Sequence, residues 1–168
     1  GISRLFGLDL MENFRRPYFS RSTAEFWGSR WHISLGRWFR DYLYVPLGGN
    51  RRGSLRRYTG VMTVFVVSGL WHAGLGYGVS WGFIVWGALN GLYQWAGMAT
   101  RGLWRGVGDR WPRLETSIPV HLFRVLFTFH LIAISWVFFR AQSVADGLTI
   151  LKKIANSALE LPGLLARY

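Results

Sequence analysis

The feature that most constrains this chain is its stretch from Tyr58 to Thr100, which contains no Asp, Glu, Lys or Arg. One helical crossing of a membrane's hydrocarbon core needs about 20 residues, so this stretch is long enough for two. Glycines at positions 74, 76 and 78 weaken a helix near its middle, because glycine loses the most backbone freedom on folding. We therefore predict two crossings within residues 58–100, separated by a break at residues 74–78.

Clusters of arginine flank this uncharged stretch on both sides. The cluster before it comprises Arg51, Arg52, Arg56 and Arg57, and the cluster after it comprises Arg101, Arg105, Arg110 and Arg113. Two crossings return the chain to its starting side, so both clusters are expected in short cytoplasmic loops, as the positive-inside rule describes. The net charge of +12 is then explained without nucleic acid, which is not an expected partner.

A third apolar stretch, residues 118–139, is again about one membrane thickness long and predicts a third crossing. Arg124 and His130 interrupt it, and ionisable residues at such depth are expected to face protein or a water-filled cavity. Residues 143–157 follow as a predicted surface helix, with apolar residues at helical spacing: Val144, Leu148, Leu151 and Ile154.

Residues 22–47 predict an amphipathic helix followed by a turn. Ser22 and Glu25 fit a capping box at its start, and Pro46 ends it. A polar stripe follows one face: Arg30, Ser34, Arg37 and Asp41. His32 is expected on the other, apolar face. The whole chain is thus expected to be an all-α, polytopic membrane protein with amphipathic or re-entrant segments.

His72 is the first candidate for chemistry, because it lies in the longest uncharged stretch beside the predicted break. An ionisable group at membrane depth is costly, which favours a functional role. A structural histidine bonded to a neighbouring helix is the alternative, and the residues alone leave both open. For His32, and more strongly for His121 and His130, a structural role is the more common explanation.

The absence of cysteine excludes disulfides, a thiolate nucleophile and cysteine-containing metal sites. A zinc site built from His32 and His72 would need further ligands. Asp41 is the one carboxylate between these two histidines in the sequence, but it falls on the stripe opposite His32. No metal is therefore expected.

Residues 78–82 match the G-x-S-x-G nucleophile elbow, with Ser80 at its centre. That elbow requires a strand before the serine and a helix after it, whereas the surroundings here are typical of a membrane helix. A chance match is favoured over an acyl-enzyme on Ser80.

Five short stretches together resemble a known family. FWGSRWHISL (residues 26–35) with WFRDYLYVPLGGNR (38–51) looks like the central signature of bacterial membrane-bound O-acyltransferases. GLWH (69–72), followed by WG (86–87), is similar to the second signature, and WVFFRA (136–141) resembles a segment of the alginate O-acetyltransferase branch. The resemblance identifies residues 1–168 as the C-terminal part of one such domain, with the N-terminal spans missing. The piece alone is expected to be inactive.

The resemblance implies that His72 is the catalytic histidine and that His32 is the second histidine of the family. Trp71, Asp41 and Asn90 are expected to support them. Three positions depart from the family pattern: Gly28, Ala73 and Asn90.

The function implied is transfer of an acyl group, expected to be acetyl, from a thioester donor to hydroxyls of a secreted polysaccharide such as alginate. Acetyl-CoA or another acyl thioester would be the donor, with no bound cofactor. The alternatives are D-alanyl transfer to teichoic acid and a non-catalytic membrane subunit of an export complex. Membrane lipids and periplasmic or membrane proteins of a polysaccharide-modification complex are the expected partners, at the bacterial inner membrane.

Overall fold

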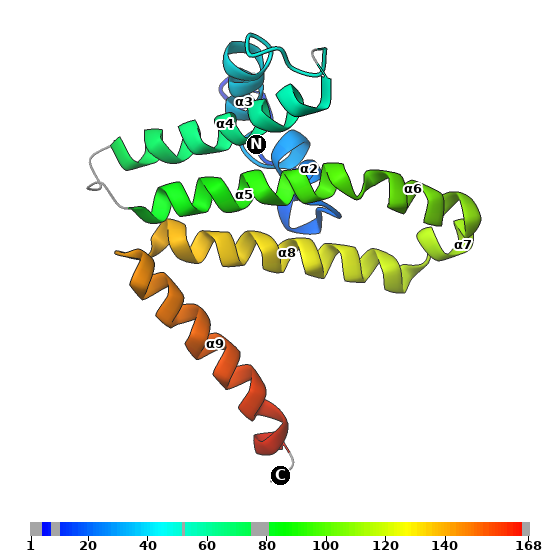
Figure 1. The fold of residues 1–168 in the computed structure, drawn as a ribbon. Helices are drawn as coiled ribbons and strands as arrows, with labels where there is room; N and C mark the ends of the chain where they lie inside the picture. Colours follow the sequence, from blue (N-terminus) through cyan, green and yellow to red (C-terminus); the bar gives the residue numbers. More distant parts are fainter. Residues whose placement is uncertain (1–4, 8–10, 52, 75–80, 166–168) are drawn as a thin grey trace.

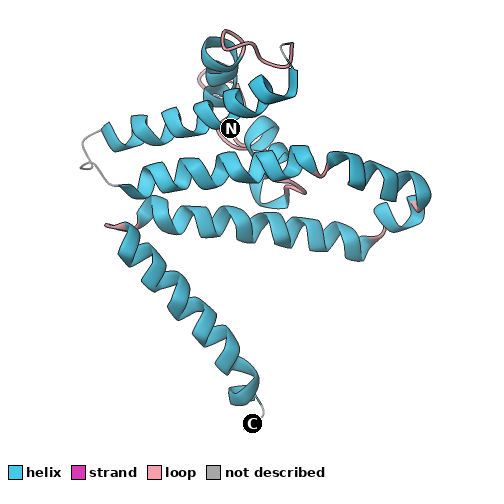
Figure 2. Cartoon of the chain, in the orientation of Figure 1, coloured by secondary structure: helices cyan, strands magenta, loops and turns pink. Residues whose placement is uncertain are grey.

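The computed structural model describes residues 5–7, 11–51, 53–74 and 81–165, with side chains described to residue 160, and its regular elements over those ranges are all helical (Figure 1, Figure 2). In chain order they are η1 (Pro17–Phe19), α2 (Thr23–Glu25), η2 (Phe26–Arg30), α3 (Ile33–Phe39), η3 (Arg40–Tyr44), α4 (Gly53–Gly74), α5 (Trp81–Ala99), α6 (Arg101–Arg110), α7 (Pro112–Glu115), α8 (Ile118–Arg140) and α9 (Val144–Leu165). Here η1 is a 3₁₀ turn, and η2 and η3 are π-helical turns. The expected all-α fold is confirmed. Helices α4, α5 and α8 lie side by side, and the short N-terminal elements pack against them (Figure 1).

Helices α4 and α5 form an antiparallel hairpin at the place where two helices are predicted. Gly74 ends α4, and the rest of the predicted break lies outside the described residues. Two glycines bring the helices into close contact: a Cβ on Gly69 would collide with the carbonyl oxygen of Phe83, and one on Gly87 with that of Phe65. Small residues at such crossings let membrane helices approach closely.

Replacing Gly87 with alanine is therefore expected to destabilise the protein by roughly 1–3 kcal/mol, the usual cost of overpacking against a neighbour that cannot move aside. The control is Gly97→Ala on the same helix, where an added Cβ meets nothing within 4 Å. Alanine favours a helix over glycine by about 0.8–1 kcal/mol, so Gly97→Ala should be neutral or stabilising. Thermal unfolding of the full-length gene product in detergent compares the two. Equal stability of both variants would show that the helices do not meet at Gly87.

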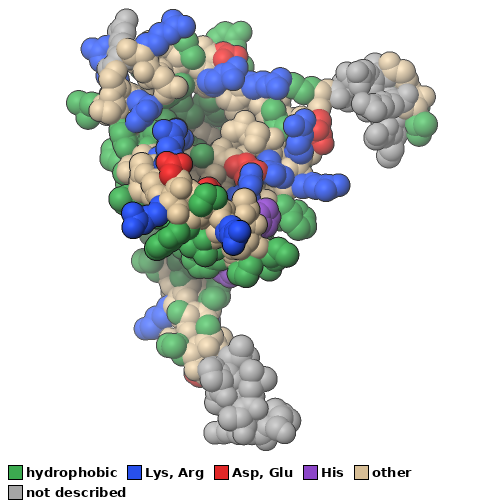
Figure 3. Space-filling view, turned by 90° about the vertical axis from the view of Figure 1, so that its right-hand side faces the viewer, with side chains coloured by type: hydrophobic (Ala, Val, Ile, Leu, Met, Phe, Trp, Pro, Cys, Tyr) green, Lys and Arg blue, Asp and Glu red, His purple; other side chains and the backbone are tan. Residues whose placement is uncertain are grey.

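The hairpin places the described arginines of the two clusters at one end, as two crossings require (Figure 1). The view onto that end shows many basic side chains (Figure 3). The clusters differ from the expectation of loops, because Arg56 and Arg57 lie at the start of helix α4 and the second cluster lies largely in helix α6. Its apolar residues Leu103, Trp104 and Val107 recur at helical spacing, and Pro112 comes only after the helix has ended. That both helices cross a membrane stays a prediction.

Helix α8 agrees in its bounds with the predicted third crossing and packs along α5. Among the described residues it is the one helix that is long and apolar enough to span a membrane. Arg124 forms an ion pair with Glu115 at 3.5 Å and lies 5.5 Å from the centroid of the Trp104 ring. The Nδ1 atom of His130 lies 2.7 Å from the carbonyl oxygen of Leu126. Arg124 therefore has partners on α6 and α7, as expected, whereas His130 is exposed and its hydrogen bond stays within its own helix.

Helix α9 begins where the surface helix was predicted and continues beyond residue 157 to Leu165. Ser143 caps it by accepting a hydrogen bond from the Asp146 N–H at 3.1 Å and donating one to the Asp146 carboxylate. The helix then leaves the bundle at an angle (Figure 1). Its side chains up to residue 160 are mostly exposed, in agreement with a surface helix.

The prediction of one amphipathic helix from residue 22 is wrong. The Ser22 hydroxyl does accept the Glu25 N–H at 3.1 Å, but the chain breaks at Trp31 and His32. His32 has a left-handed backbone with φ 46°, which few residues other than glycine adopt. Asn13 stabilises the break, because its carbonyl accepts the Ile33 N–H at 3.0 Å. Helical periodicity alone does not reveal such a distant partner.

Candidate active site

His72 occupies the last turn of α4 and is half-buried. Four rings surround its imidazole, with centroid separations of 4.7 Å to Trp71, 4.9 Å to Phe139, 5.7 Å to Trp86 and 6.1 Å to Phe83. The Phe139 and Trp86 rings stand nearly perpendicular to it, at 77° and 88°. An imidazole enclosed in this way has few orientations available.

Three helices build this cluster. Phe83 and Trp86 lie one turn apart on α5, so they share a face towards α4. Phe139 comes from the last turn of α8, and its ring contacts both of them, at 4.9 Å and 5.1 Å. The close approach at Gly69, three residues before His72, sets the spacing of the helices. The site therefore depends on tertiary packing.

His32 is placed differently from the expectation that it faces the apolar side of a helix. Its side chain is exposed, at the break before α3, and its ring centroid lies 5.6 Å from that of Phe14. The imidazoles of His32 and His72 are nevertheless near enough to interact electrostatically. The two predicted catalytic residues therefore lie in one region of the molecule.

An ion-pair network fixes the segment that carries His32. Both Nε and Nη2 of Arg30 donate to Glu25, at 2.9 Å and 2.7 Å, and Nη1 donates to the backbone carbonyls of Arg15 and Arg16 at 3.2 Å. Burial alone would raise the pKa of Glu25, but the backbone N–H of Arg21 and the Arg30 guanidinium outweigh that effect and lower it. Glu25 is thus held as a carboxylate, and the segment is tied down on both sides.

Asn90 lies at the centre of the contacts between the N-terminal elements and α5. Its side chain is fully buried, and its amide donates to the Trp86 carbonyl at 2.9 Å. Its oxygen accepts the indole N–H of Trp27, also at 2.9 Å. Both ends of the amide are therefore satisfied, and Asn90 connects η2 with the helix that faces His72.

The other two predicted supporting residues have different positions. Trp71 is exposed at 45% and lies beside His72 at the outer side of the cluster. Asp41 is exposed and pairs with Arg40 at 2.8 Å. Its hydrogen bond from Arg40 lowers the pKa of the Asp41 carboxyl. The described contacts join Asp41 to neither histidine.

The remaining chemical candidates add little to this arrangement. Ser80 lies outside the described residues, so the acyl-enzyme alternative stays untested. No three His, Asp or Glu side chains of the described ranges gather closely enough to hold a metal ion. Two cavities, of about 310 and 390 Å³, adjoin α8, and neither is lined by His72 or His32.

Reasoning from single residues missed Phe83, Phe139 and Trp27. Phe139 and Trp27 stand inside motifs that carried the family resemblance, but nothing in those motifs indicated contacts with the histidine site. Phe83 has no distinguishing signal, because it is one of many aromatic residues in an apolar stretch. Its role depends on the register of α5 against α4.

Comparison with known proteins gives consistent matches. The profile of MBOAT, the membrane-bound O-acyltransferase family, matches residues 1–143. The chain is 40% identical over 145 residues to "Probable alginate O-acetylase AlgI" of Pseudomonas putida. The aligned region covers 86% of this chain and 26% of the relative. It is 36% identical over 152 residues to "Peptidoglycan O-acetyltransferase" of Helicobacter pylori, covering 90% of this chain and 26% of that protein.

A more distant match is "Teichoic acid D-alanyltransferase" of Streptococcus thermophilus, 34% identical over 98 residues, which covers 54% of this chain and 22% of the relative. The chain spans about a quarter of the length of the first of these relatives. With a family-model match over residues 1–143 and a helical fold, this chain belongs to the membrane-bound O-acyltransferase family.

Proposed function

We propose that the full-length protein transfers an acetyl group from a thioester to hydroxyls of a secreted polysaccharide, with His72 as the general base. The observation that carries this proposal is the position of His72, half-buried and enclosed by rings from two other helices, with His32 nearby. The match to the family over residues 1–143 supports the reaction class.

The chemistry requires one proton acceptor beside an electrophilic carbonyl. A neutral His72 nitrogen takes the proton of the acceptor hydroxyl as its oxygen attacks the thioester carbonyl carbon. The carbon–sulfur bond then breaks, and the imidazolium returns the proton to the leaving thiolate. Imidazoles suit this cycle because they titrate near neutral pH. In this proposal His32 holds the acceptor or the carbonyl oxygen, or assists the movement of the proton.

An acetyl donor such as acetyl-CoA and an alginate-like acceptor are favoured over D-alanyl transfer. The acetyltransferase relatives match 86–90% of the chain at 36–40% identity. The D-alanyltransferases match either 54% of it at 34% identity or 84% at 25%. An inner-membrane, multi-pass location with periplasmic or membrane partner proteins completes the proposal.

Deleting the gene and restoring it tests this function. Mild base hydrolyses the esters on the secreted polymer, and chromatography then separates the released acetate from released D-alanine. Loss of acetate at unchanged polymer yield, restored by the gene, is expected. Loss of D-alanine would show the related activity instead, and loss of the polymer itself would indicate an export subunit.

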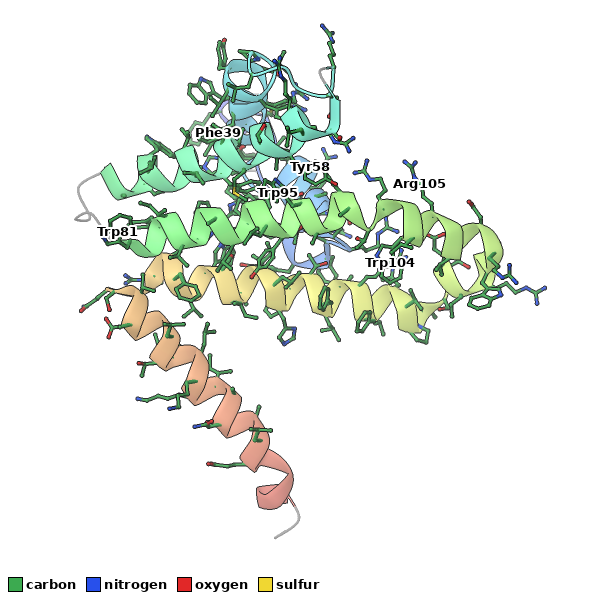
Figure 4. All side chains as sticks on the ribbon, in the orientation of Figure 1. Phe39, Tyr58, Trp81, Trp95, Trp104 and Arg105 are labelled. Atoms are coloured by element: carbon green, nitrogen blue, oxygen red, sulfur yellow. The ribbon has the colours of Figure 1, made fainter. Side chains whose placement is uncertain are left out.

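The topology carries a prediction of its own, because both arginine clusters lie at one end of the α4–α5 hairpin and Trp81 lies at the other (Figure 4). Single cysteines at Ser54 and Gly106 should be shielded from an impermeant thiol reagent in intact cells, whereas one at Trp81 should be labelled. Gly106 is suitable because an added Cβ there meets nothing within 4 Å, whereas at Gly108 it would meet the Glu115 carboxylate. The full-length background must first be freed of any other cysteine. Labelling of Ser54→Cys or Gly106→Cys alone would contradict the two-crossing arrangement.

A further inference from the structure

Trp27 connects the segment that carries His32 with the helices that enclose His72. It lies in the π-helical turn η2, five residues before His32. Its indole N–H donates to the side-chain oxygen of Asn90, at 2.9 Å and across 63 positions of sequence. Short π-helical turns are frequent at functional sites, where they redirect side chains.

The ring of Trp27 extends this connection towards His72. Its centroid lies 5.7 Å from that of Trp86 and 5.7 Å from that of Phe65, nearly perpendicular to both. Trp86 in turn stands at 88° to the imidazole of His72. A continuous set of contacts therefore runs from η2 through Trp27 and Trp86 to His72.

The hydrogen bond to Asn90 gives Trp27 a single position. Asn90 is fully buried, so its oxygen has no water to replace the indole N–H. A buried acceptor left without its donor is costly, and the segment would shift to relieve that cost. His32 would then move with η2, because only Trp31 separates the end of η2 from His32.

We infer that Trp27 is a positioning residue, whose hydrogen bond to Asn90 sets the place of His32 relative to His72 during acyl transfer. The inference rests on the proposed function, in which both histidines serve one reaction. A displacement of about 1 Å at a catalytic group can cost about 10²-fold in rate. Losing the indole N–H should therefore reduce turnover even where the fold survives.

The test is Trp27→Phe in the full-length protein, which removes the N–H and keeps an aromatic ring. The matched control is Trp95→Phe on α5, where the indole N–H donates to the Tyr58 carbonyl at 2.6 Å (Figure 4). Tyr58 lies near the start of α4, whereas His72 lies in its last turn. Both variants lose one indole hydrogen bond, so comparable shifts in the unfolding temperature are expected. Trp27→Phe should lower kcat by about 10- to 100-fold with little change in the KM of the donor. Trp95→Phe should stay within about twofold of the parent protein.

A double variant separates positioning from general damage. If Trp27 acts by placing His32, then Trp27→Phe should cost no further rate in a His32→Ala background. If the double variant instead loses rate by the product of the two single fold-losses, the inference is overturned. A kcat of Trp27→Phe equal to that of the parent protein would overturn it as well. Should Trp27→Phe fail to fold, 3-benzothienylalanine at position 27 keeps the size of the ring and removes only the N–H, and the same two outcomes decide. An inactive parent protein would count against the proposed function, whereas an active parent with a silent Trp27 variant would count against this inference alone.

Discussion

Replacing His72 with alanine is expected to lower acetylation of the secreted polymer by about 10²–10⁴-fold, the usual contribution of a general base. The expectation follows from its position, since the imidazole is half-buried among the rings of Phe83, Trp86 and Phe139. The measurement is the acetate released per unit of polymer from cells that carry the full-length variant at matched membrane abundance.

The control for this change is His121→Ala, because His121 is an exposed histidine near the start of α8. It should leave acetylation within about twofold, the range of most surface substitutions away from a site. Normal acetylation with His72→Ala would exclude His72 as the base. Loss of acetylation with Ser80→Ala, at unaltered abundance, would support an acyl-enzyme instead.

We expect the second large effect from replacing His32 with alanine. The transfer rate of the double variant with His72→Ala is the most informative measurement. His32 lies near enough to interact with His72, so the two are expected to act as a unit. His32→Ala should lower the rate by about 10-fold or more, and the double variant should be little worse than His72→Ala alone. Initial rates of transfer by the purified full-length proteins measure all three.

The control for that series is Arg37→Ala, an exposed change on the helix that follows His32. It should leave the rate near that of the parent protein. If the rate of the double variant falls by the product of the two single fold-losses, His32 and His72 contribute separately. A parent-like His32→Ala would make His32 a structural residue of the turn at Asn13.

The long elements of this fold are predictable from the sequence because their apolar stretches have the length of helices. The pair α4 and α5 follows from the uncharged run with glycines at its middle, and α8 follows from residues 118–139. The N-terminal region is not predictable in this way. The left-handed backbone at His32 depends on hydrogen bonds from Ile33 to Asn13 and from Arg30 to Arg15 and Arg16, and helical periodicity contains no information about such distant partners.

The sequence singles out His72 as the candidate for chemistry, and its catalytic role stays a prediction, whereas the residues that surround it could not be predicted. His72 stands out because an ionisable group in an apolar run needs an explanation. The two hydrogen bonds of Asn90 join it to Trp27 and Trp86, and its supporting role in the site stays a prediction. Phe139 and Phe83 enclose His72 only because α8 and α5 meet there, and that register is fixed by tertiary contacts such as Gly69 against Phe83.

The most direct test of direct acyl transfer assisted by His72 is a single-turnover experiment with the purified full-length protein in lipid nanodiscs. A donor thioester with an isotopically labelled acetyl group is mixed with the acceptor polysaccharide, and the label is followed in polymer and protein. Label should appear on polymer hydroxyls with the parent protein, with none attached to the protein, and His72→Gln should slow its appearance by at least about 10²-fold. Undiminished transfer by His72→Gln, or label that passes first through a protein side chain, would contradict the mechanism.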